Sequence, residues 1–251
     1  MNGVNFFEDF TDPDYDFSFL QVYVNDELTD IPANALTAIA GDDVRIVSRS
    51  KPYPFFYPYK KDYIASIEEP LPFMDNFSFS SYFENCRSLV SIPENLFINN
   101  PQITVFHRCF YDCQSLISIP AGLFDNNPNV TDFSYCFYYC TSLESIPVGL
   151  FDNNPNVTDF SRCFYDCSFL TSIPKGLFNN NPNVTSFNYC FYGCRNLTVN
   201  VQIGSTTTRS VDVYRFARNT EEKGTVYCRA GSNAYNAFLE DTSANVKVLT
   251  Y

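Results

Sequence analysis

One unit of 27 residues repeats in register through the middle of the chain. Its closing cysteine falls at Cys86, Cys113, Cys140, Cys167 and Cys194, each 27 residues after the last. A fixed period between about 20 and 50 residues is typical of a solenoid, because one unit cannot bury its own apolar face and must stack on its neighbours. The sequence therefore predicts a stack of coils, each formed by one copy of the unit.

Apolar residues occupy the same positions in copy after copy. Each unit carries a leucine, then an Ile-Pro pair, then one phenylalanine on either side of an Asn-Pro turn. The columns are Leu89, Leu116, Leu143, Leu170 and Leu197; Ile92, Ile119, Ile146 and Ile173; Phe97, Phe124, Phe151 and Phe178; and Phe106, Phe133, Phe160 and Phe187. With 26 Phe, 18 Tyr and no Trp in the chain, we expect an interior of stacked aromatic columns.

The spacing after Phe133 predicts a short helix in each coil. Phe133, Cys136, Phe137, Cys140 and Leu143 recur at i, i+3, i+4, i+7 and i+10, which places them on one helical face. The flanking segments are short and rich in branched or aromatic residues, so they favour strands that end at Asn and Pro turns. The predicted fold class is an α+β repeat in which each coil runs strand, helix, strand and tight turn.

The repeat divides the chain into three regions. Residues 1–64 lack it and contain strand-like pieces at 17–24 and 44–47; we expect a β-rich cap over the open end of the stack, or an attachment segment. Residues 65–198 form the predicted solenoid. Residues 199–251 are predicted to be a C-terminal capping repeat, with a strand at Val226, a serine-capped helix at 232–238 and a final strand at 246–249.

Nine of the ten cysteines belong to the repeat, in two columns four residues apart. Free thiols that act as small buried hydrophobic groups explain the columns best, because both share the predicted inner face with Phe137 and Leu143. Disulfides require converging Cβ atoms, which this spacing meets poorly. A zinc site is a weak match to a CxxxC spacing in a chain with one histidine.

Net charge and hydropathy exclude several classes of function. A net charge of −12 argues against binding nucleic acid or an anionic bilayer, and no apolar run is long enough to insert into a membrane. The start of the chain lacks the features of a secretion signal. Asp12, Asp14 and Asp16 have the spacing of a calcium loop, but Phe17 and Tyr23 occupy the positions that need glycine and glutamate; we interpret them as a solvated acidic stretch.

The sequence offers little that could serve catalysis. The one histidine, His107, shares its column with Ser134, Ser161 and Asn188, and no common nucleophile, metal or phosphate-binding motif is present. We therefore expect a protein that is not an enzyme and has no cofactor.

A row of tyrosines is the candidate binding site. Tyr111, Tyr138, Tyr165 and Tyr192 follow the buried phenylalanines, and Tyr135 and Tyr189 add further rings. Such a row can anchor a protein partner or stack on sugars; alternatively, the Phe-Tyr pairs only seal the groove between coils. A second row, Val90, Ile117, Glu144 and Thr171, varies between copies as a solvent-facing or ligand-facing column can. The Asn-Val-Thr triplets at Asn129, Asn156 and Asn183 recur at one turn, so we expect unmodified side chains that bond the backbone.

The motifs CxSLxSIPxGLF, NPNVTxF and CFYxC, with the closing GTVYCRAGSNAYNAF, resemble the BspA-like leucine-rich repeat proteins of bacterial cell surfaces and their phages. The resemblance covers residues 66–251 and implies a right-handed solenoid with short strands, an extracellular or cell-surface location, and adhesion to a host protein or glycan. The 27-residue unit and the cysteine before Phe-Tyr depart from the family pattern. The alternative is a structural component of a larger particle, such as a virion head or tail decoration attached to other virion proteins through residues 1–64.

Overall fold

The computed structural model describes most of the repeat and the regular elements on either side of it. The described residues are 4–5, 20–24, 27–29, 37–38, 44–48, 66–67, 70–71, 73–197, 200–203, 214–217, 224–228, 232–240 and 246–250. The chain divides into two compact units, residues 1–60 with 72–75 and residues 61–71 with 76–251, which we describe separately. The acidic stretch at Asp12, Asp14 and Asp16 and the aromatic segment at 51–63 lie outside the described residues.

The first unit contains short antiparallel strands. Strand β1 (Val4–Asn5) pairs with β4 (Thr37–Ala38). Strand β2 (Leu20–Val24) lies between β3 (Glu27–Thr29) and β5 (Val44–Ser48) in a three-stranded sheet. The strands expected near 17–24 and 44–47 are therefore confirmed, while the role of residues 1–64 as a cap or an attachment segment stays a prediction.

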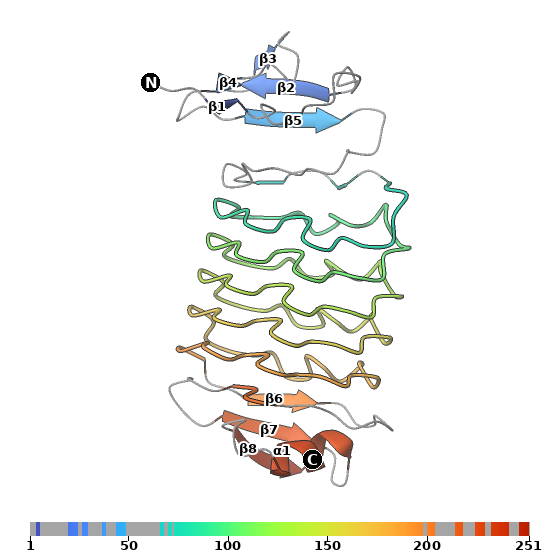
Figure 1. The fold of residues 1–251 in the computed structure, drawn as a ribbon, viewed down its shortest axis with the longest axis vertical. Coiled ribbons are helices and arrows are strands. Elements are labelled where there is room, and N and C mark those ends of the chain that lie inside the picture. The colour runs from blue at the N-terminus through green and yellow to red at the C-terminus, as the bar shows by residue number, and fades with distance from the viewer. Residues whose placement is uncertain are drawn as a thin grey trace. The chain divides into compact units, whose positions relative to one another are not determined.

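In the second unit, successive copies of the repeat lie on one another as coils (Figure 1). Parallel β-bridges join residues 27 positions apart, which are Ser78 with Val105, Val105 with Asp132, Asp132 with Asp159, and Asp159 with Ser186. A second line of pairing joins Ser118 to Ser145. Equivalent backbone segments of neighbouring copies are therefore in register.

Phenylalanine columns fill the space inside the coils, as the repeat predicts. Phe137 is fully buried and its ring stacks on Phe110 at 5.4 Å between centroids and on Phe164 at 5.5 Å. Two further columns run beside it, with spacings of 5.6–5.9 Å for Phe79, Phe106, Phe133, Phe160 and Phe187 and 5.9–6.1 Å for Phe97, Phe124, Phe151 and Phe178. The expectation that equivalent rings lie over each other is confirmed.

The prediction of a short helix in each coil is wrong. The N–H groups of Cys109, Tyr111 and Cys113 each donate to the carbonyl three residues earlier, whereas those of Arg108 and Phe110 donate to Ser134 and Cys136 in the next coil. Arg108 also has a positive φ of 55°, which a right-handed helix excludes. The segment is a chain of tight turns whose alternate N–H groups bond the neighbouring coil, and such turns also bring residues at i, i+3, i+4 and i+7 to one side.

Beyond the repeat, the expected strand and helix order is confirmed. Strands β6 (Asn200–Ile203), β7 (Gly224–Cys228) and β8 (Val246–Thr250) form a parallel sheet in that order, and helix α1 (Asn233–Glu240) lies between β7 and β8 in the chain. The Ser232 hydroxyl accepts a hydrogen bond from the Tyr235 N–H at 3.2 Å, so serine caps this helix as predicted. No helix in the described part of the chain has the length and apolarity that crossing a bilayer requires.

Candidate functional site

The turn segment of each coil directs its side chains inward and outward in consecutive pairs, such as Cys109 with Phe110 inward and then Tyr111 with Asp112. Cysteine and phenylalanine point to the interior, and three outward columns run side by side across the coils. The central column is the predicted tyrosine row. We call Tyr111, Tyr138, Tyr165 and Tyr192, together with Tyr135 and Tyr189, the tyrosine strip; all six rings are partly exposed.

The four central tyrosines form one continuous stack. Centroid distances are 4.6 Å from Tyr111 to Tyr138, 4.6 Å from Tyr138 to Tyr165 and 4.9 Å from Tyr165 to Tyr192, with planes within 18° of parallel. This spacing matches the separation of about 4.7–4.9 Å between paired strands. The buried phenylalanine columns have wider ring spacings, up to 6.1 Å, so the tyrosine rings are the more closely stacked.

Stacking determines what the tyrosines can offer to a partner. Both faces of Tyr138 and Tyr165 are covered by neighbouring rings, and the Arg108 guanidinium lies over the Tyr111 ring at 4.1 Å. A sugar ring that stacks on an aromatic side chain needs a free face. The row therefore cannot stack on sugars along its length, and it presents ring edges and hydroxyl groups instead.

The column beside this stack alternates arginine with tyrosine. It contains Arg108, Tyr135, Arg162, Tyr189 and Arg215, all with φ between 49° and 57°. The Arg162 guanidinium lies 5.2 Å from the Tyr135 centroid and 4.5 Å from the Tyr189 centroid. Tyr135 and Tyr189 also contact the central stack, at 5.5 Å from Tyr138 and from Tyr192 respectively. The structure thus brings all six predicted tyrosines together on one surface.

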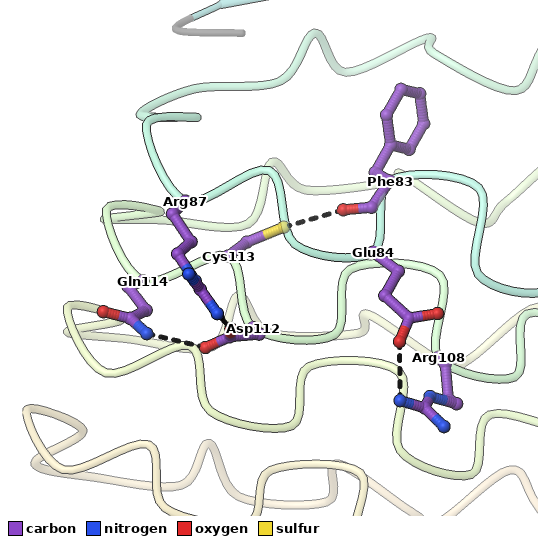
Figure 2. A network of polar contacts seen from close by, with 7 residues as sticks. All are labelled: Phe83, Glu84, Arg87, Arg108, Asp112, Cys113 and Gln114. Carbon is purple, nitrogen blue, oxygen red and sulfur yellow. Dashed lines mark hydrogen bonds and ion pairs between the residues drawn. The ribbon is translucent and has the colours of Figure 1, made fainter. Parts of the chain in front are cut away.

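The column on the other side of the stack carries Asp112, Tyr139, Asp166 and Gly193. The Asp112 carboxylate accepts hydrogen bonds from Arg87 at 2.8 Å and from Gln114 at 2.7 Å (Figure 2). The Asp166 carboxylate reaches Tyr139 in the preceding coil and raises the pKa of that phenol. A Cβ atom at Gly193, where φ is 78°, would collide with Asp166, so glycine there makes room for the carboxylate.

Burial and crowding raise the pKa of the two inner tyrosines of the stack. Partial burial raises the pKa of Tyr138 well above its ordinary value, and the neighbouring Tyr165 and Tyr111 hydroxyls raise it further. Burial likewise raises the pKa of Tyr165, with Asp166 adding to the effect. At neutral pH these two phenols therefore stay protonated and can both donate and accept hydrogen bonds.

His107 does not activate a nucleophile. Its Nδ1 lies 2.7 Å from the Ser134 hydroxyl, and that hydroxyl donates to Asp132 at 2.5 Å. Because the serine proton goes to the aspartate, His107 Nδ1 must donate rather than accept. A catalytic triad places histidine between serine and the carboxylate, whereas here a buried serine lies between them. That the chain is not an enzyme stays a prediction.

The ten cysteines are buried free thiols. In the second column the S–H groups of Cys113, Cys140, Cys167 and Cys194 each donate to a backbone carbonyl of the preceding coil. The distance is 3.2 Å from Cys140 to Phe110 and 3.2 Å from Cys113 to Phe83 (Figure 2). Burial raises the pKa of Cys136 and Cys163 well above that of a free thiol. Since the thiolate is the reactive and metal-binding form, these side chains act as small apolar groups.

Sequence reasoning missed a buried asparagine ladder. The residues before the turn prolines, Asn100, Asn127, Asn154 and Asn181, are buried, and the Asn154 amide donates to the carbonyls of Asn127 at 2.9 Å and Phe124 at 3.0 Å. Its signal was an asparagine before the proline in every copy. The Asn156 and Asn183 amides bond Pro128 and Pro155 in the preceding coil, so the predicted backbone contacts of these residues are confirmed.

The second candidate row is exposed. Val90, Ile117, Glu144 and Thr171 all face solvent, while their backbones pair, with the Glu144 N–H donating to the Ile117 carbonyl at 3.0 Å. The row lacks the ring contacts of the tyrosine strip.

The chain matches no model of a known protein family and no curated protein.

Proposed function

We propose that the chain is a non-enzymatic recognition or adhesion module that binds a partner protein through the tyrosine strip. The observation that carries this proposal is the continuous stack of four partly exposed tyrosine rings, with Tyr135 and Tyr189 beside it. Tyrosine and arginine are the side chains most enriched among residues that dominate protein binding energy. The strip supplies the tyrosines, and Arg108 and Arg162 lie against its rings.

Stacking also supports the proposal energetically. A side chain that becomes ordered only on binding costs about 0.5–1.5 kcal/mol of affinity. The central rings are already held by their neighbours at 4.6–4.9 Å, so little of that cost remains. The covered ring faces favour a protein partner over a glycan, because a protein can use ring edges and hydroxyl groups.

The proposal includes the fold class, a leucine-rich-repeat-type right-handed solenoid like the BspA-like proteins that the sequence resembles. Its support is the parallel pairing at intervals of 27 residues and the equally spaced aromatic columns. The short strands implied by that resemblance have their counterpart in the bridges that join neighbouring coils. The turns described above replace the short helices.

The test compares two faces of the full chain. The wild type would be immobilised and used to capture partners from a protein extract, in parallel with a glycan array, and captured proteins would be purified and measured by calorimetry. The strip variant Tyr138→Ser with Tyr165→Ser should bind a purified partner at least tenfold more weakly, about 1.4 kcal/mol. The control variant Val90→Ser with Ile117→Ser changes the second exposed row and should bind like the wild type.

Thermal unfolding of each variant separates lost binding from lost folding. A partner whose affinity is unchanged in the strip variant, or falls only in the control variant, would contradict the proposal. A glycan that binds the wild type but not the strip variant would support a recognition role and contradict the proposal that the partner is a protein.

A further inference from the structure

Arg162 lies beside the tyrosine strip, and its charged guanidinium contacts two tyrosine rings of the strip. Its guanidinium lies between the faces of Tyr135 and Tyr189, at 5.2 and 4.5 Å from their centroids. A guanidinium that stacks on aromatic faces keeps its edge free, and along that edge its N–H groups form the planar fork that fits a carboxylate. Arg162 is partly exposed, so that edge is accessible.

Arg108, in the same column, shows what this position binds. Its guanidinium also lies over a tyrosine ring, and it pairs with the Glu84 carboxylate of the preceding coil at 2.5 Å (Figure 2). Glu84 occupies the tyrosine column, 24 residues before Arg108. The residue in the same relation to Arg162 is Tyr138. The chain therefore supplies a carboxylate to Arg108 and a phenol at the corresponding place beside Arg162.

The acidic groups nearest to Arg162 in the sequence already have other partners. Asp159 accepts hydrogen bonds from the Ser161 N–H and hydroxyl. Asp166 hydrogen-bonds Tyr139 and is attracted by Arg195. Within the described residues, no carboxylate pairs with Arg162. Among the residues that the structure describes, its positive charge thus has no carboxylate partner, on a chain whose net charge is −12.

We propose that Arg162 receives an aspartate or glutamate side chain of the partner protein, held as a bidentate pair between Tyr135 and Tyr189. The inference rests on the proposed function, because it names the chemistry that the strip recognises. A single carboxylate suits this site better than a polyanion, since the negative field of the whole chain repels a polyanion such as a sulfated glycan. The Arg108–Glu84 pair, joined through one guanidinium nitrogen, is the intramolecular precedent for a carboxylate at this column.

A random twelve-residue peptide library displayed on phage would be panned on the full chain, after removal of peptides that bind the strip variant Tyr138→Ser with Tyr165→Ser. We expect the enriched peptides to share an acidic residue. Replacing that residue by Asn or Gln, or making Arg162→Gln, should each weaken binding at least tenfold, and the double change should be no weaker than either alone. Arg162→Lys should restore little, because an ammonium lacks the planar fork.

Lys175→Gln is the matched control, since Lys175 is an exposed cation on a different column and should leave affinity unchanged. Equal binding to the wild type and to Arg162→Gln would overturn the inference, and so would enriched peptides without an acidic residue. In either case, peptide binding that depends on the strip would still support the proposed function. No enrichment relative to the strip variant would overturn both. Binding of heparin that Arg162→Gln abolishes would also overturn the inference, because the site would then serve a sulfated glycan.

Discussion

The inward and outward columns of the turn segment follow different rules. The inward column Phe110, Phe137, Phe164 and Phe191 is uniform, with spacings of 5.3–5.5 Å. The outward column alternates Arg108, Tyr135, Arg162 and Tyr189. Identical apolar rings stack favourably, whereas like charges about 5 Å apart repel by about 0.8 kcal/mol even in water. The core therefore repeats every 27 residues, while the charged surface repeats every two coils.

The largest expected effect is a loss of stability in alkaline solution, which we expect the inward cysteines to cause far more than the outward tyrosines. Burial raises the pKa of six thiols in the inward columns, Cys113, Cys136, Cys140, Cys163, Cys167 and Cys190. An unfolded thiol loses its proton near pH 8.5, so this stabilisation is complete below that pH and is lost above it. One pH unit higher, each thiol costs about 1.4 kcal/mol, or about 8 kcal/mol for six. Urea unfolding under reductant at pH 7.5 and 9.5 measures the loss.

A matched variant isolates the thiols. Burial also raises the pKa of Cys228, outside the columns, which makes seven shifted thiols. Cys136→Ala with Cys163→Ala removes two of them, so roughly two sevenths of the pH dependence should disappear. The outward tyrosines contribute much less in this range, because an unfolded phenol titrates near pH 10 and is still mostly protonated at pH 9.5. A free energy of unfolding that hardly changes between pH 7.5 and 9.5 would contradict the burial of neutral thiols.

The next prediction compares a buried phenylalanine with an exposed one. Phe137→Ala removes a fully buried ring that stacks on both neighbouring coils, and the cavity should lower the free energy of unfolding by about 3–5 kcal/mol. Phe169→Ala removes a ring that is 59% exposed, and the change should stay within about 0.5 kcal/mol. Urea unfolding of both variants measures the difference. A loss below about 1 kcal/mol for Phe137→Ala would contradict the inward assignment.

The sequence predicted the columns but not the backbone that carries them. Which residues point inward follows from the apolar pattern alone, so Phe133, Phe137 and the cysteines were placed correctly. The same pattern fits a helix and a chain of turns, and the choice depends on whether an N–H group such as that of Phe110 bonds its own coil or Cys136 in the next. That choice is set by neighbouring copies, which a periodicity within one copy does not contain.

The residues of the candidate site were predicted from the sequence, but the arrangement of their rings was not. The tyrosine row was found because it recurs every 27 residues. The closed ring faces depend on centroid distances of 4.6–4.9 Å between tyrosines of neighbouring coils, which no single residue reveals. The alternation of Arg162 with Tyr135 and Tyr189 is visible in the sequence, but its meaning appears only once the three side chains are known to be neighbours.

Two asparagines of the same turn give a smaller contrast. Asn154→Ala removes two buried hydrogen bonds and leaves the carbonyls of Asn127 and Phe124 without that donor, so we expect a loss of about 2 kcal/mol. Asn156→Ala removes one exposed bond to Pro128 and should cost less than about 0.5 kcal/mol. Denaturant unfolding of both variants tests the ladder, and equal losses would show that its buried bonds contribute no more than surface ones.

The smallest effect tests why the outward column alternates. Tyr135→Arg would place cations in three consecutive coils and remove the ring that lies over Arg162 at 5.2 Å, so we expect a loss of about 1 kcal/mol in low salt, a Tm shift of about 2–4 °C. The repulsive part should shrink as ionic strength rises, because salt screens exposed charges. Tyr135→Phe keeps the ring and should leave the Tm unchanged. If Tyr135→Arg proved harmless at every salt concentration, folding would not require the alternation, and partner recognition would have to account for it.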